Sequence, residues 1–185
     1  KAATYDWAQS LLETPSFQRH DVYRALDVLA EENDFIQSEL YKQACDVLSR
    51  RDDVLYYNCT NFFFEIEEEE GLKQYGQSKE HRPNPIVQMG LFMDADGLPL
   101  AFSIQPGNQN EQKSLKPLER KIIHDFGKAR FVVCTDAGLA STANRRFNGI
   151  QDRAFITVQS LKKMKGFQQA WALDPDGWQT ETDPS

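Results

Sequence analysis

The spacing of apolar residues over the first 50 positions of the chain predicts helices. The stripe is clearest in the last of them, and its members are Ile36, Leu40, Ala44, Val47 and Leu48. Either Asn33 or Asp34 is a suitable N-cap for that helix, because a short polar side chain there can accept a hydrogen bond from the first turn. We expect this segment to be a packing appendage. The alternative is part of a DNA-binding or dimerisation module, and no recognition-helix signature decides between them.

From residue 54 onward the pattern changes to short β-rich runs separated by turn residues. Strands are expected at 54–57 and 62–64, joined through 58–61, and then at 86–93, 98–104, 131–134 and 154–158. The segment Asp94-Ala95-Asp96-Gly97 predicts a hairpin turn between two of these strands. Helices are expected at 111–126 and 139–148, and residues 160–170 are a basic helix or loop.

The order of the expected elements predicts the fold class. Three strands joined by short connections favour an antiparallel meander, and the later strands, each reached through a helix, favour parallel crossovers. This order indicates an α/β protein with an RNase H-like mixed sheet, preceded by an N-terminal helical segment. The expected division is a helical segment over 1–53, a partial RNase H-like core over 54–173 and an acidic tail over 174–185.

Charge is distributed unevenly along the chain. The 185 residues carry a formal net charge of −7, which by itself argues against a nucleic-acid partner. Residues 71–173, however, hold 15 basic and 8 acidic side chains, whereas the segments on either side are acidic. The net charge is therefore a poor guide, and the basic middle segment is the part of the chain suited to nucleic acid.

Other broad classes of protein are disfavoured. No apolar run approaches the ~20 residues of a membrane span, so no membrane partner is expected. The cysteines Cys45, Cys59 and Cys134 are odd in number and widely spaced, which favours a reducing, cytoplasmic location over a disulfide framework. The chain has no phosphate loop, dinucleotide motif or hydrolase elbow, and its scattered histidines argue against a zinc site.

Asp136 is the acidic residue with the strongest functional signal. It follows an apolar strand, and Ala137 and Gly138 after it allow a ligand to come close. Ligands of mixed α/β sheets bind beyond the carboxyl ends of strands, and a carboxylate is costly to bury there unless it binds something. The alternative is that Asp136 caps the following helix. On the first long strand, the expected centre of the sheet, the polar residue is the uncharged Asn58.

Several stretches carry a family resemblance. The run LYYNCTNFFFEIEEEEGLKQYGQSKEHRPNPIVQMGLFMDADGLPLAFSIQPGNQNEQKSLKPLE, with FVVCTDAGLAS and RAFITVQS, resembles the DDE transposases of bacterial insertion sequences. More narrowly, it resembles the group with a large β-rich insertion in the RNase H-like catalytic domain. The resemblance runs from the N-terminal helices to about Asp174. It implies double-stranded DNA as the partner, both element ends and target, and a homodimer in a synaptic complex.

The resemblance also implies a metal site with two departures in this chain. The family uses three carboxylates to hold two Mg²⁺ ions, which activate water and then a 3′-hydroxyl for in-line attack. Carried over, Asp136 is the second metal-binding and catalytic acid, and Asn58 stands where relatives have the first Asp. The third acid belongs to a Tyr-x2-Arg-x3-Glu-x6-Lys motif that does not occur before Ser185. We therefore expect a fragment of a longer transposase or a decayed copy, catalytically inactive and with weak or no Mg²⁺ binding.

Basic residues outside the metal site are the expected DNA contacts. The candidates are Lys79, His81, Arg82, Lys113, Lys162 and Lys163. The first three share a polar loop that the resemblance makes a candidate for phosphate contacts near the site, the alternative being a solvated loop. The others are expected to make sequence-independent phosphate contacts at most. Two further functions stay open: a non-catalytic DNA-binding or interaction remnant, and a structure-directed nuclease of the same fold, such as a resolvase.

Overall fold

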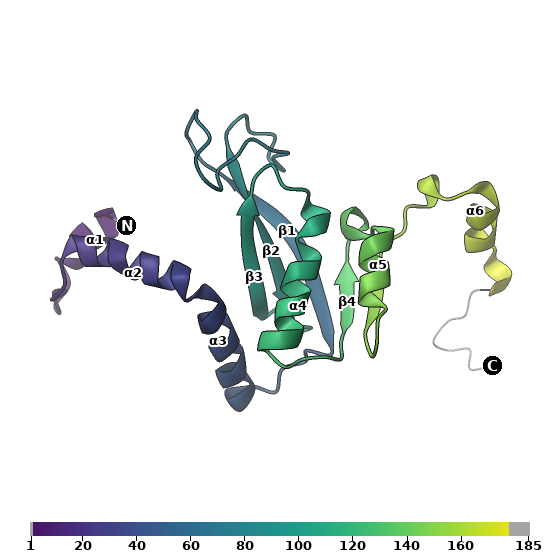
Figure 1. Ribbon diagram of the computed structural model, residues 1–185, viewed down its shortest axis with the longest axis horizontal. Helices are drawn as coiled ribbons and strands as arrows, with labels where there is room; N and C mark the ends of the chain where they lie inside the picture. Colours follow the sequence, from purple (N-terminus) through teal and green to yellow (C-terminus); the bar gives the residue numbers. More distant parts are fainter. Residues whose placement is uncertain (1, 178–185) are drawn as a thin grey trace.

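A five-stranded mixed sheet forms the body of the protein (Figure 1). The computed structural model describes residues 2–177. The strands are β1 (Val54–Phe63), β2 (Ile86–Met93), β3 (Pro99–Pro106), β4 (Val132–Thr135) and β5 (Ala154–Thr157), in the order β3-β2-β1-β4-β5. The pairs β1–β2 and β2–β3 are antiparallel, whereas β1–β4 and β4–β5 are parallel. This is the RNase H-like arrangement that the sequence predicts, with β1 at the centre.

Six helices and four short 3-10 turns complete the described chain. The helices are α1 (Ala2–Ala8), α2 (Arg19–Glu31), α3 (Asn33–Val47), α4 (Leu115–Asp125), α5 (Thr142–Asn148) and α6 (Gly166–Leu173). The 3-10 turns are Glu111–Lys113, Ala137–Leu139, Leu161–Lys163 and Pro175–Gly177.

Three local expectations are corrected by the structure. The helix expected from residue 111 is divided into a 3-10 turn and α4, with Ser114 between them. The polar residues 58–61 do not interrupt the first strand, because β1 pairs with β2 without a break from Tyr56 to Phe63. Neither Asn33 nor Asp34 caps α3: the N-cap is Glu32, whose side chain makes no capping hydrogen bond.

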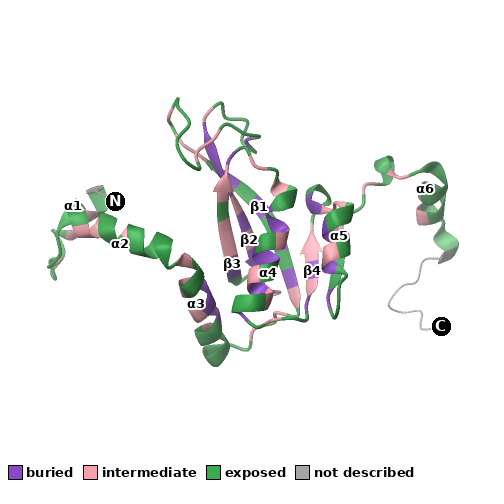
Figure 2. Cartoon of the chain, in the orientation of Figure 1, coloured by how far each residue is buried: buried purple, intermediate pink, exposed green. Residues whose placement is uncertain are grey.

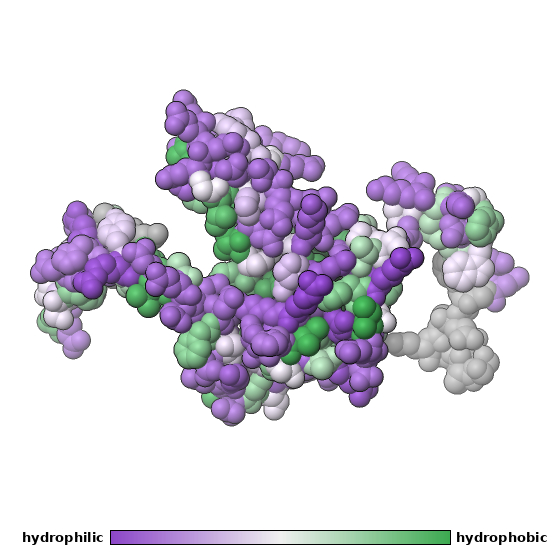
Figure 3. All heavy atoms as spheres, in the orientation of Figure 1, coloured by the Kyte–Doolittle hydropathy of each residue, from purple (hydrophilic) through white to green (hydrophobic). Residues whose placement is uncertain are grey.

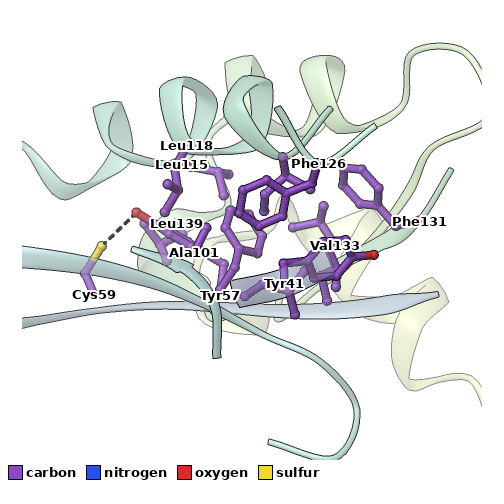
Figure 4. Close-up of a cluster of buried hydrophobic side chains, with 14 residues drawn as sticks. Tyr41, Tyr57, Cys59, Ala101, Leu115, Leu118, Phe126, Phe131, Val133 and Leu139 are labelled. Atoms are coloured by element: carbon purple, nitrogen blue, oxygen red, sulfur yellow. Dashed lines mark hydrogen bonds between the residues drawn. The ribbon is translucent and has the colours of Figure 1, made fainter. Parts of the chain in front are cut away.

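The hydrophobic core lies on one face of the sheet only. Alternate residues of β1, among them Leu55, Tyr57 and Cys59, are buried against α4, whose Leu118 and other apolar residues face them (Figure 4). The residues between them in β1 are exposed, and Tyr56 on that open face keeps 47% of its surface accessible. Figure 2 shows the same contrast, with buried residues gathered where the sheet meets α4. The described helices therefore cover one face of the sheet and leave the other open.

The N-terminal helices contact the body through α3 and the linker that follows it. The Tyr41 ring stacks on Phe126 with a centroid distance of 4.9 Å, and the Arg50 guanidinium pairs with Asp94 at 2.8 Å. Helix α2, in contrast, has no buried residue and extends away from the sheet (Figure 1). The proposed boundary at residue 53 stays a prediction, and most of the expected acidic tail, residues 178–185, lies outside the described residues. Among residues 2–177, no helix is long and apolar enough to cross a membrane.

Candidate functional site

The strand register brings Asn58 and Asp136 to the same level of the sheet. The last paired residues of the parallel strands β1 and β4 are Tyr57 and Thr135. The residue after Tyr57 is Asn58, and the residue after Thr135 is Asp136. Both side chains are exposed. In β1 the alternation of buried and exposed positions places Asn58 on the open face of the sheet. The two residues singled out by sequence thus lie at the same level of the sheet. Asp136 directly follows the carboxyl end of β4, where α/β sheets bind ligands, whereas Asn58 lies within β1, which continues to Phe63.

Asp136 uses one carboxylate oxygen for a local structural role. Its Oδ1 accepts a hydrogen bond of 3.1 Å from the Leu139 amide, which caps the 3-10 turn Ala137–Leu139. Within residues 2–177 its Oδ2 accepts no hydrogen bond, so one oxygen stays available to a ligand. A Cβ at Gly138 would lie 3.4 Å from Oδ1, so the glycine keeps the approach to the carboxylate open. Asp136 thus caps the 3-10 turn, whereas Ser141 caps the helix α5 that follows, and this capping leaves Oδ2 of Asp136 without a hydrogen bond among residues 2–177.

Asn58 is a weaker ligand for a cation than an aspartate at the same position would be. Its amide is neutral, and its Oδ1 accepts a hydrogen bond of 2.8 Å from the Cys59 backbone amide. A ligand at this position would compete with that bond. The amide nitrogen is a donor and cannot ligate a metal.

The donors present do not fit a two-metal centre. Among the described residues, no group of three or more His, Cys, Asp or Glu side chains is arranged to hold a metal ion. Magnesium sites are built from carboxylates and waters, and each ion of a two-metal site needs anionic oxygens. Glu65 follows the end of β1 and is too far along the chain, at ~3.3 Å per residue, to replace Asn58. We derive no chemical step through Mg²⁺ for this polypeptide.

A polar cleft of about 560 Å³ lies beside the carboxyl end of β4. Its walls are the loop 76–81, the segment 107–112 and Gly138 from the turn after Asp136. The first two loops touch so closely that a Cβ on Gly76 would lie 2.0 Å from the Gly107 carbonyl oxygen. Gln112 Nε2 donates to the Gly138 carbonyl at 3.0 Å, which ties the cleft to the turn that Asp136 caps. The cleft and the Asp136 turn are therefore one connected region.

The basic loop predicted from sequence forms part of this cleft. Lys79 Nζ lies 3.8 Å from Glu111 Oε1 and donates to the Cys59 carbonyl, which holds the loop against β1. The Arg82 guanidinium stacks over the Phe63 ring at 4.8 Å. His81 has a φ of 55°, in the left-handed region, so the loop turns sharply there and exposes the ring. These three residues share one loop near Asp136.

The remaining predicted DNA contacts are spread over other elements. Lys113 is exposed on the 3-10 turn that precedes α4. Lys162 and Lys163 lie on a 3-10 turn beyond β5, where Lys163 lines a separate hollow with Arg145 and Gln168. The structure does not gather all six basic residues into one surface.

Sequence reasoning missed Gln88, which holds the cleft in shape. Gln88 is 5% exposed, and its Nε2 donates to the carbonyls of Gly107 at 3.0 Å and Gln109 at 2.7 Å. These bonds fix the loop after β3 against β2. The available signal was a polar side chain at a core-facing position in the otherwise apolar strand 86–93.

Comparisons with known proteins find only distant likeness. No family model matches the sequence, and no curated protein matches it. Two solved structures resemble the fold at 12% sequence identity: the Mos1 transposase paired-end complex with left transposon end, with a TM-score of 0.40, and the Mos1 mariner paired-end complex with Mn, with a TM-score of 0.39. Each alignment covers 83% of this chain and 49% of the other, so the chain spans about half the length of those transposases.

Proposed function

We propose that this chain belongs to a DDE transposase of the bacterial insertion-sequence type and binds duplex DNA, but does not itself cut it. The observation that carries the proposal is the register of β1 and β4, which sets Asn58 at the level of Asp136, the residue directly after β4, in a β3-β2-β1-β4-β5 sheet. Those are the two strand positions at which the resemblance expects the first two metal-binding acids.

The proposed loss of catalysis follows from the charge at these positions. Two-metal strand cleavage needs carboxylates to neutralise the cations and to fix their separation. Asp136 supplies one carboxylate, and Asn58 supplies a neutral amide whose oxygen is already bonded to the Cys59 amide. A non-catalytic DNA-binding protein is therefore favoured for this polypeptide over an active nuclease.

The proposed DNA contact at this site is the loop that bears Lys79, His81 and Arg82. Lys79 and His81 line the cleft beside the Asp136 turn. The exposed Arg82 guanidinium stacks on Phe63 and lies 3.6 Å from Glu80 Oε2, a partner that a phosphate would have to replace. Phosphate contacts of this kind are independent of sequence and weaken as salt is raised.

A metal titration tests whether Asn58 and Asp136 form one site. We expect Asn58→Asp to tighten Mn²⁺ binding about tenfold over the unaltered protein, because it restores a second carboxylate beside Asp136. The gain should disappear in Asn58→Asp combined with Asp136→Asn. Isothermal titration calorimetry and the Mn²⁺ paramagnetic resonance signal measure both affinities.

Thr60→Asp is the matched control. Thr60 is exposed on the same face of β1, about 7 Å further along the strand, and has no β4 residue paired beside it. The substitution Thr60→Asp adds the same negative charge as Asn58→Asp, but further from Asp136. Equal tightening by Thr60→Asp and Asn58→Asp would contradict the shared site. Nicking of duplex DNA by the unaltered protein that Asp136→Ala abolishes would contradict the loss of catalysis.

A further inference from the structure

Helices α4 and α5 present a cluster of cations on their solvent side. The buried residues Leu118 and Ile122 fix the rotation of α4, so that the half-buried Lys116 and the exposed Arg120 lie outside the core. In α5 the buried residues are Asn144 and Asn148, so the exposed Arg146 faces away from the core. We call Lys116, Arg120 and Arg146 the α4–α5 basic face. Figure 3 shows hydrophilic side chains projecting over these helices.

The Phe147 ring brings part of this face together. Lys116 Nζ lies 5.8 Å and the Arg120 guanidinium 5.2 Å from the ring centroid of Phe147, which comes from the neighbouring helix. A third cation, Arg153, lies 4.7 Å from the same ring. Three positive groups around one aromatic ring repel one another, although each is attracted to the ring face.

In the described part of the chain, no acidic side chain forms an ion pair with the α4–α5 basic face. Among residues 2–177, Lys116, Arg120 and Arg146 form no ion pair, whereas Arg24 and Lys42 in the N-terminal helices each pair with an acid. The acid nearest in sequence, Glu119, is fully buried and bonded to Arg153 at 2.6 Å. Glu119 pairs directly with Arg153, and its carboxylate also interacts with the charges of Arg120 and Lys116. Among the described residues the three cations of the face nevertheless have no ion-pair partner of their own, and an external anion would stabilise them.

We propose that the α4–α5 basic face binds the phosphate backbone of a DNA duplex, as a surface separate from the Asn58–Asp136 site. Lys116 and Arg120 are about 6 Å apart along the helix axis, and the exposed Arg146 lies on α5, which contacts α4. Such a cluster fits a linear polyanion, because duplex DNA carries one negative charge per ~1.7 Å of its axis. The choice of DNA as the polyanion rests on the proposed function, whereas the charge surplus does not.

The two surfaces face different sides of the sheet. Helix α4 packs on the face that holds Leu55 and Tyr57, and Asn58 lies on the opposite, open face. A duplex on the α4–α5 basic face would therefore lie on the covered side of the sheet, away from the face that bears Asn58.

The test is fluorescence anisotropy with the full chain and a labelled 20–25-base-pair duplex of arbitrary sequence, at about 50 and 200 mM salt. Lys116→Gln/Arg120→Gln/Arg146→Gln should weaken binding at least about tenfold. It should also lower the slope of log affinity against log salt by about one unit for each phosphate that is no longer neutralised. Circular dichroism confirms that the three substitutions leave the fold intact.

The control is Arg24→Gln/Lys42→Gln/Lys73→Gln. It removes the same charge from three exposed or half-exposed cations that have acidic partners. Equal losses in both triple variants would overturn the proposal, because only net charge would matter. No loss in the α4–α5 variant, or no duplex binding by the unaltered protein at low salt, would overturn it as well.

A Lys79→Gln/Arg82→Gln variant separates this proposal from the proposed function. If it weakens binding and the α4–α5 variant does not, the second surface is refuted and the loop stands. If the α4–α5 variant alone weakens binding, the second surface stands and the loop contact is refuted. If both do, their effects on log affinity should add, since distant independent sites are additive.

Discussion

The buried ion pair between Glu119 and Arg153 joins α4 to the chain segment before β5. Glu119 is fully buried, the Arg153 side chain is 5% exposed, and Arg153 Nη1 lies 2.6 Å from Glu119 Oε1. With its amide nitrogen facing Glu119, Asn148 donates to Oε2 at 2.7 Å. Burial raises the pKa of Glu119 to about 7, against the opposing charges of Arg153, Arg120 and Lys116. The ionised form of Glu119 therefore persists only because its hydrogen-bond and charge partners offset the cost of removing the carboxylate from water.

Replacing Arg153 with Met should destabilise the protein by about 3–5 kcal/mol, the usual cost of leaving one member of a buried pair uncompensated. The loss should depend on pH in a defined window. With Arg153 present, the raised pKa of Glu119 means that its contribution to stability is complete below pH ~4.5 and is lost as pH rises through about 7. Without Arg153 the pKa rises further, so the loss continues above pH 7, at about 1.4 kcal/mol per pH unit.

The free energy of unfolding of both proteins is measured by urea titration, followed by far-ultraviolet circular dichroism, at pH 6 and pH 8. The difference in the free energy of unfolding between the unaltered protein and Arg153→Met should be larger at pH 8 than at pH 6. The double variant Glu119→Leu/Arg153→Met should recover most of the loss, because an apolar pair of similar volume replaces two buried charges. A loss below about 1 kcal/mol, or an equal loss at both pH values, would refute this account of the pair.

Three further substitutions test other parts of the structure. Gly90→Ala places a Cβ 2.2 Å from Tyr57 Oη and should destabilise the protein by about 1–3 kcal/mol in a urea titration; a neutral result would mean that the ring can move freely. Burial raises the pKa of Asp52, but hydrogen bonds from Lys128 and Tyr41 lower it below its usual value, so its stabilisation is present above pH ~4 and lost as pH falls. Asp52→Asn should therefore lose stability at pH 7 and change little at pH 2, and a constant difference would contradict the linkage. Asp136→Ala should cost about 1 kcal/mol through loss of the cap and speed hydrogen exchange at the Leu139 amide, while Asp136→Asn retains most of the cap.

Local patterns were enough to predict most of the elements. The strand 86–93 was predicted with its true bounds, because its apolar run and the following Asp94–Gly97 turn are written in adjacent residues. The Asp94 side chain caps that turn by accepting from the Asp96 and Leu98 amides, as the hairpin prediction requires. Its ion pair with Arg50 could not be predicted, because the partner lies 44 residues away and no local rule links them.

By itself, the sequence determined the order of strands and helices, hence the RNase H-like fold class, and the uncharged amide at position 58. Periodicity and residue chemistry act over a few neighbouring residues, so they can be read without the fold. Only the tertiary structure decided that Asn58 and Asp136 share a level of the sheet, because register depends on how two distant strands pair. The tertiary structure also decided which cations have an acidic side chain as an ion-pair partner. The chain sums to −7, yet Glu119 is buried in a direct pair with Arg153, and Lys116 and Arg120 have no ion-pair partner among the described residues.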